Sequence, residues 1–144
     1  MKKIVGLILV VLVPFGCVTA PSPEKTDVEE LMERFITGLK EGDIDVLMST
    51  YWPDAEMVLV LPDGQELNFD GIEQIRSHQL ETLRNPSMPA IEFSKPEGKI
   101  RGSSATYRIL MQVPGARSLN RFELARRDGE WRIIRQFAEV SLSE

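Results

Sequence analysis

The chain has 144 residues, with 22 acidic and 17 basic side chains, a net charge of −5 and 42% hydrophobic residues. This length allows one domain with a packed core but not two. A single cysteine and a single histidine exclude disulfides within the chain, CxxC redox chemistry and multi-histidine metal sites, and the negative charge disfavours nucleic acid as a partner.

The N-terminus has the pattern of an export signal. Met1-Lys2-Lys3 precedes an uncharged, largely apolar run over residues 4–15, which is shorter than the about 20 residues that a membrane-spanning helix needs. The only cysteine, Cys17, follows Gly16, where a lipoprotein signal peptidase would leave it as the acylated first residue. We therefore expect a lipoprotein signal peptide over residues 1–16 and membrane attachment through acyl chains, such as palmitate, on Cys17.

Two processing routes fit this N-terminus. Pro14 and Phe15 stand where a lipobox prefers leucine and a small residue, so ordinary secretory cleavage after Ala20, with loss of Cys17, is the alternative. Both routes export the protein to the cell envelope or beyond. If Cys17 is acylated, Val18 after it favours the outer membrane of a Gram-negative cell, because aspartate at that place is the usual retention signal.

The mature chain is expected to begin with a tether over residues 17–25, which contains prolines and polar side chains, and to continue as a single domain over residues 26–144. Thr26 and Glu29 have the spacing of a capping box and predict the start of a helix. Apolar residues at helical spacing give this helix one buried stripe: Val28, Leu31, Met32, Phe35 and Leu39.

The remaining elements follow from caps, turns and alternation. Gly42 predicts the end of the first helix, and Asp43 predicts the cap of a short second helix that Trp52-Pro53-Asp54 ends. A third helix is expected from a cap at Asp70 to about Leu83. Strands are predicted at 56–61, 65–69, 91–94, 99–101, 104–113, 119–127 and 131–140. Helices followed by an antiparallel sheet make an α+β domain.

Five segments, in order, carry a family resemblance: Val28–Phe35, Glu41–Asp45, Tyr51–Ala55, Gly71–Ile75 and Gly129–Ile134. They resemble the nuclear-transport-factor-2-like (NTF2-like) superfamily, which includes SnoaL-like and ketosteroid-isomerase-like domains. The resemblance implies a cone-shaped, curved antiparallel sheet packed on three N-terminal helices around an apolar cavity. Because this fold carries many functions, the function depends on the groups in the cavity.

The catalytic groups of a ketosteroid isomerase are mostly missing. The resemblance places its general base at Leu59, its oxyanion tyrosine at Phe35 and its second oxyanion acid near Glu123, and the first two are apolar here. The sequence therefore favours a domain that is not an enzyme. The alternative is a small lyase, isomerase or hydrolase that acts on a hydrophobic substrate with His78, Glu123 or Asp54 in catalysis. His78 is equally compatible with an ordinary position on a helix surface.

Alternation in the strand 104–113 places one row of side chains on the cavity face. With this row, the resemblance predicts a ligand pocket lined by Phe35, Tyr51, Leu59, Gln79, Tyr107, Ile109 and Met111. Such a lining suits a small hydrophobic ligand, and the same residues equally suit a filled core. The sequence has no motif for nucleotide, zinc-protease or EF-hand chemistry, so no cofactor and no metal are expected.

The last two strands are rich in arginine: Arg117, Arg121, Arg126, Arg127, Arg132 and Arg135. These residues either meet an anionic surface or an acidic envelope partner, or they offset the acidic helices of the same domain. The inner face of the last strand is either the row with Trp131, Ile133 and Phe137 or the row with Ile134, Gln136 and Ala138. A homodimer through the sheet face is expected. Altogether we expect a lipid-anchored envelope protein whose domain binds a small ligand or a protein partner.

Overall fold

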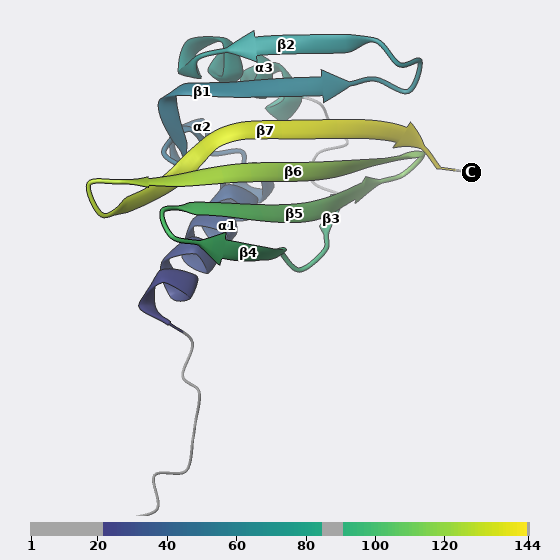
Figure 1. Ribbon diagram of the computed structural model, residues 1–144. Helices are drawn as coiled ribbons and strands as arrows, with labels where there is room; N and C mark the ends of the chain where they lie inside the picture. The colour runs from purple at the N-terminus through teal and green to yellow at the C-terminus, as the bar shows by residue number, and fades with distance from the viewer. Residues whose placement is uncertain (1–21, 85–90, 144) are drawn as a thin grey trace, which may run out of the picture.

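A computed structural model describes residues 22–84 and 91–143 (Figure 1). The signal peptide, Cys17 and most of the expected tether lie outside the described residues. The elements in chain order are α1 (Pro23–Glu41), α2 (Ile44–Met48), β1 (Tyr51–Val60), β2 (Glu66–Asp70), α3 (Ile72–Leu83), β3 (Glu92–Phe93), β4 (Glu97–Arg101), β5 (Ser104–Val113), β6 (Ala116–Arg127) and β7 (Glu130–Leu142).

The strands form one curved sheet that has helices on one face only. Its order is β2-β1-β7-β6-β5-β3, and β4 also pairs with β5. Figure 1 shows α1, α2 and α3 behind the sheet, with the opposite face uncovered by any described helix. The predicted α+β cone is therefore confirmed. One pair differs from a purely antiparallel sheet, because β1 and β7 run parallel and the segment between them supplies the crossover that parallel neighbours need.

Helix α1 begins three residues before the predicted capping box. The Ser22 side chain accepts a hydrogen bond from the Lys25 N–H at 3.2 Å, and Pro23 occupies the first helical position, where its fixed φ and missing N–H cost nothing. Thr26 lies inside the helix and its hydroxyl faces the Ser22 carbonyl at 3.5 Å. The last three residues assigned to the tether are thus helical, because the Ser22 cap and Pro23 start the helix before the predicted capping box at Thr26.

Two other helix ends differ from the sequence prediction: α2 already ends at Met48, so that Trp52-Pro53-Asp54 lies inside β1, and α3 has another cap. Gly42 ends α1 in the left-handed conformation, with φ of 66°, and Asp43 caps α2 by accepting from two backbone N–H groups at 3.1 Å. The cap of α3 is Gly71, with φ of 84°, and not Asp70. Asp70 ends β2, and its N–H donates to the Gln74 side chain at 2.9 Å.

A β-bulge in β7 reconciles the two rows that the sequence offered for its inner face. Glu123 of β6 pairs with Arg135, whereas Leu124 pairs with Ile133, so Ile134 is the extra residue. Trp131 and Ile133 are buried before the bulge, and Gln136 and Ala138 are buried after it. Each predicted row is correct on one side of Ile134.

The core lies between the helices and the inner sheet face. Phe35 of α1 is fully buried at its centre. Its ring contacts Phe122 of β6 edge-to-face at 4.9 Å and Tyr51 of β1 at 6.3 Å between centroids. These contacts attach α1 to two strands of the sheet. Aromatic pairs of this geometry contribute about 1 kcal/mol each beyond the stabilisation that comes from their buried area.

Candidate functional site

A cavity of about 310 Å³ lies between the inner sheet face and helices α1 and α3. Its walls are mostly apolar, and they include Phe35 and Leu39 of α1, Met57 and Leu59 of β1, and Met111 and Val113 of β5. Residues with polar side chains line it from α3, β6 and β7: His78, Gln79, Thr82, Arg117, Ser118, Asn120 and Gln136. An apolar enclosure with a few convergent polar groups is the usual form of a small-molecule site.

The predicted pocket residues divide into two groups. Phe35, Leu59, Gln79 and Met111 line the cavity. Tyr51, Tyr107 and Ile109 share the inner face but lie in the core beside the cavity, each at most 5% exposed. Tyr107 lies near Glu29 in the first half of α1, which covers this end of β5. Alternation identifies the face of a strand, whereas the helix packed on that face decides which part of it stays open.

The polar end of the cavity is a chain of hydrogen bonds between four buried side chains and the half-buried Ser118. The Gln79 amide donates to the Tyr51 hydroxyl at 3.3 Å, and that hydroxyl donates to the Gln136 side-chain carbonyl. The Gln136 amide donates to Asn120 Oδ1 at 2.9 Å, and the Asn120 amide donates to Ser118 Oγ at 3.1 Å. We call these five side chains the amide relay.

The direction of the amide relay is fixed at its Ser118 end. Asn120 Nδ2 also lies 3.4 Å from the Ser118 backbone carbonyl, which can only accept. Asn120 therefore presents its oxygen to Gln136, and Gln136 presents its oxygen to Tyr51. Tyr51 must then donate to Gln136 and accept from Gln79, which leaves the Gln79 carbonyl without a role in the chain.

Burial keeps Tyr51 in its donor form. The phenol is completely buried, and loss of hydration raises its pKa far above 10.0, although the hydrogen bond from Gln79 acts in the opposite direction. The amide relay is therefore neutral throughout at physiological pH.

Sequence reasoning included Gln79 and Tyr51 but missed Asn120, Ser118 and the role of Gln136. A usable signal exists. Asn120 has the same parity on β6 as Phe122 and Leu124, which are core residues, and a polar side chain at a core position requires a buried partner.

His78 lies on α3 at the cavity wall. Its ring stacks on Phe69 of β2, with centroids 4.5 Å apart and planes at 28°. Burial lowers the pKa of His78 below 6.5, and the Glu81 carboxylate opposes part of that shift. Among the described residues, the imidazole has no hydrogen-bond partner.

The three catalytic candidates do not converge. Asp54 is exposed and accepts two hydrogen bonds from Arg127, at 2.7 and 3.1 Å, and these bonds lower the pKa of its carboxyl group. Glu123 lies on the uncovered sheet face, 3.8 Å from Arg135. Its expected place as an oxyanion acid inside the cone is wrong, because Glu123 alternates with the inward-facing residues of β6. His78 alone reaches the cavity.

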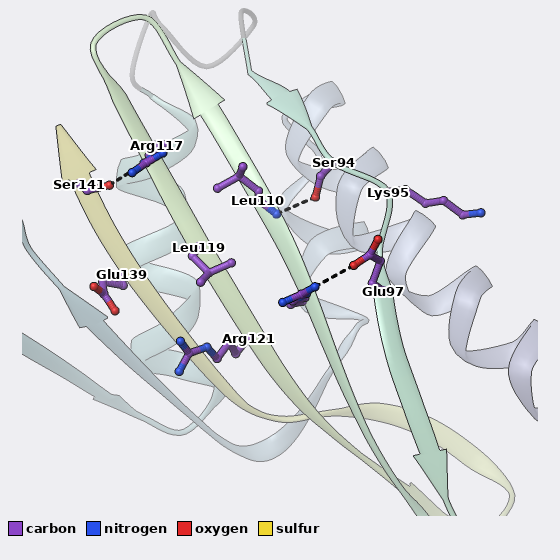
Figure 2. A pocket seen from close by; sticks show the side chains of 10 residues that line it. Ser94, Lys95, Glu97, Leu110, Arg117, Leu119, Arg121, Glu139 and Ser141 are labelled. Atoms are coloured by element: carbon purple, nitrogen blue, oxygen red, sulfur yellow. Dashed lines mark hydrogen bonds and ion pairs between the residues drawn. The ribbon is translucent and has the colours of Figure 1, made fainter. Parts of the chain in front are cut away.

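The uncovered face of the sheet carries a groove of about 560 Å³ (Figure 2). Arg108 forms an ion pair with Glu97 at 3.0 Å, and Arg117 Nε donates to Ser141 Oγ at 3.1 Å. Arg121 extends beside the groove with its guanidinium 5.8 Å from the Phe137 ring centroid. The groove is basic, because Lys95 and three arginines line it against two acidic residues, Glu97 and Glu139.

The arginines of the last two strands are mostly paired within the domain. Ion pairs join four of them to acidic residues: Arg126 to Glu24, Arg127 to Asp54, Arg132 to Glu130, and Arg135 to Glu56 and Glu123. Arg117 and Arg121 have no acidic partner in the described part of the chain. These arginines thus largely offset the acidity of the rest of the domain.

Among the described residues, no three histidine, cysteine, aspartate or glutamate side chains lie close enough together to hold a metal ion. No helix within residues 22–84 and 91–143 has the length and apolar character to cross a bilayer.

Comparisons with known proteins agree with this architecture. A family model described as putative lumazine-binding matches residues 23–137. Among solved structures, an NTF2-like protein of unknown function from Shewanella baltica OS155 is 19% identical, with a TM-score of 0.71 over 87% of this chain and 99% of that chain. One from Methylobacillus flagellatus KT is 15% identical, with a TM-score of 0.71 over 88% and 98%. A third, from Pseudomonas putida KT2440, is 18% identical, with a TM-score of 0.69 over 81% and 85%.

No curated protein matches the sequence. The structural matches confirm the expected NTF2-like fold, and the family match covers most of the described chain. The chain therefore belongs to the putative lumazine-binding family, and its fold is the NTF2-like fold.

Proposed function

We propose that this protein is a non-catalytic binding domain that takes a small, largely apolar molecule into its cone cavity. The observation that carries the proposal is the cavity itself, whose volume of about 310 Å³ lies at the lower end of the range for ligand sites. The amide relay gives it one polar end. The family description supports a binding role and makes lumazine one ligand to test.

Binding is favoured over catalysis because the His78 ring has no hydrogen-bonded acid or base among the described residues, although the Glu81 carboxylate is near enough to influence its pKa. General acid–base chemistry needs a titratable group within hydrogen-bond reach of the reacting atoms and a second group that orients it. Asp54 and Glu123 are engaged with arginines elsewhere on the surface. A lyase, isomerase or hydrolase therefore stays the second candidate.

Native mass spectrometry of the protein isolated from its own envelope tests the binding function. We expect an adduct of small-molecule mass that dissociates on collisional activation. The variant Ala116→Phe places a ring at a residue that lines the cavity, and it should lose the adduct. Leu119→Phe, on the same strand but facing the outer groove, is the matched control and should keep it. A folded wild-type protein without an adduct, which also binds no added apolar probe, contradicts the proposal.

The domain is proposed to work at the cell envelope, attached through acyl chains on Cys17. The support is the sequence pattern of residues 1–17. Cells that express the full chain with labelled palmitate should give a labelled protein, and Cys17→Ser should give none. An unlabelled wild-type protein of mature mass would instead indicate cleavage after Ala20.

The partner expected at the uncovered sheet face is a second copy of the chain. Arg121 and Glu139 border the same groove and have no partner of opposite charge among the described residues, so two copies related by a two-fold axis can exchange these charges. Light scattering should give the mass of a dimer, and Arg121→Glu should shift it towards the monomer. A monomer at all concentrations contradicts this proposal.

A further inference from the structure

Gln79 presents an unsatisfied acceptor at the polar end of the cavity. The side chain is 3% exposed, and its amide nitrogen is used by Tyr51. Its carbonyl oxygen has no partner among the described residues. In that part of the chain, only one side-chain polar atom is both fully shielded from solvent and without a partner, and it is Trp131 Nε1. The Gln79 oxygen has no partner there either, so it is not fully shielded and is accessible from the cavity that Gln79 lines.

Gln136 presents a donor beside this acceptor. Its oxygen accepts from Tyr51, and one amide hydrogen is donated to Asn120. The second amide hydrogen has no place in the relay, and Gln136 lines the cavity. Gln79 and Gln136 both bind the Tyr51 hydroxyl and both line the cavity, so their two amide groups meet at one part of the cavity wall.

The described residues that line the cavity place no charge at this end that would hold an anion. Arg117, one of its two ionisable lining residues, turns its guanidinium to Ser141 on the outer sheet face (Figure 2). The other is His78, which is half-buried against Phe69 and neutral at pH 8. A carboxylate in contact with the amide relay would lose its hydration without gaining a cationic partner.

We propose that Gln79 and Gln136 recognise an uncharged ligand that has an apolar body and an amide edge, with an N–H beside a C=O, as in a lactam, an imide or a primary carboxamide. The ligand N–H donates to the Gln79 oxygen, and its carbonyl accepts from the Gln136 amide. This inference rests on the proposed function, because it needs the cavity to take up a ligand.

Three probes of one size test the inference on the full mature chain at pH 8: 2-naphthamide, 2-acetylnaphthalene and 2-naphthoate. The ketone replaces the amide NH₂ by methyl and keeps the acceptor, and the carboxylate adds a charge. By isothermal titration or ligand-detected NMR, we expect the amide to bind at least ~10-fold more tightly than the ketone, and the carboxylate more weakly than either. A purely apolar cavity would favour the ketone, because the amide is better hydrated in water.

Two variants on α3 locate the recognition. Gln79→Leu removes the acceptor and should bring the affinity for the amide to within ~2-fold of that for the ketone. Thr82→Val is the matched control. It also lines the cavity, but its hydroxyl is bonded to the His78 carbonyl at 3.1 Å, so it should leave the preference for the amide unchanged.

The outcomes separate this inference from the proposed function. If the ketone and the amide bind equally, or if the carboxylate binds best, the amide inference is overturned while the binding function stands. If none of the three binds, the proposed function itself fails. The comparison of probes on the wild-type protein decides the question even if Gln79→Leu does not fold.

Discussion

The Tyr51 hydroxyl donates a hydrogen bond to the Gln136 side-chain carbonyl, across 85 residues of sequence. It joins the first strand to the last at the polar end of the cavity. Both groups are at most 2% exposed, so neither can exchange this bond for one with water.

Tyr51→Phe should therefore destabilise the fold. It leaves the Gln136 oxygen and a Gln79 amide hydrogen without partners, and we expect a loss of ~1–3 kcal/mol in the free energy of unfolding, measured by urea denaturation. Tyr107→Phe is the control, because the described residues offer its hydroxyl no side-chain partner, and its loss should stay below about 0.5 kcal/mol. Equal effects would mean that the amide relay is not a structural unit.

The dependence of unfolding free energy on alkaline pH should also reveal the burial of the Tyr51 phenol. Because the pKa of Tyr51 is raised above 10.0, its contribution is fully present below pH 10 and is lost as pH rises from there through the folded-state pKa. In this range the wild-type protein should lose up to ~1.4 kcal/mol of stability per pH unit more than Tyr51→Phe does. Parallel pH profiles for the two proteins would show that the phenol is hydrated.

His78 should give the opposite pH dependence: its contribution to the free energy of unfolding is lost as pH falls, not as pH rises. Burial lowers its pKa below 6.5, so the unfolded chain binds the proton first. The contribution of neutral His78 is fully present above pH 6.5 and is lost as pH falls through the folded-state pKa.

The single histidine makes this measurable by NMR titration of its ring protons. The midpoint should lie below 6.5, and it should move towards that value in Phe69→Ala, which removes the stacked ring. A wild-type midpoint at or above 6.5 would contradict the position of His78 in the cavity wall.

Gly98 should be the position of strand β4 that is least tolerant of a side chain. A Cβ at this place would lie 2.0 Å from the Thr106 carbonyl oxygen and 2.6 Å from the Tyr107 ring. We expect Gly98→Ala to cost ~1–3 kcal/mol of unfolding free energy in urea, through displacement of β4 from β5. Lys99→Ala, at the next and exposed position, should be nearly neutral. A neutral Gly98→Ala would mean that β4 is already detached.

The sequence predicted the elements and the fold because local signals and periodicity agree there. Gly42, Asp43 and the alternation of residues 104–113 each specify a cap or a face, and the structure confirms them. The start of α1 was misplaced because two start signals lie four residues apart, at Ser22 and Thr26. Alternation alone does not predict a bulge, so the sequence allows two inner faces for β7, and the unpaired Ile134 shows that each applies on one side of the bulge.

The cavity was predicted less well because it depends on contacts between distant elements. Alternation placed Tyr107 and Met111 on one face, but the packing of α1 on one end of β5 decides that only Met111 lines the cavity. The amide relay joins residues from α3, β1, β6 and β7, and no spacing in the sequence links them. Glu123 was misplaced because a resemblance fixes a strand more securely than it fixes the residue that faces inward.

The most direct test of the central claim uses the methyl groups of four methionines as reporters. Met57 and Met111 line the cavity, whereas Met32 and Met48 are buried away from it. A protein labelled at its methionine methyl carbons is titrated with 2-acetylnaphthalene, and the four signals are followed by NMR. We expect saturable shifts at Met57 and Met111, with Met32 and Met48 unchanged. No saturable shift at Met57 and Met111, or equal shifts at all four, would contradict a ligand-binding cavity.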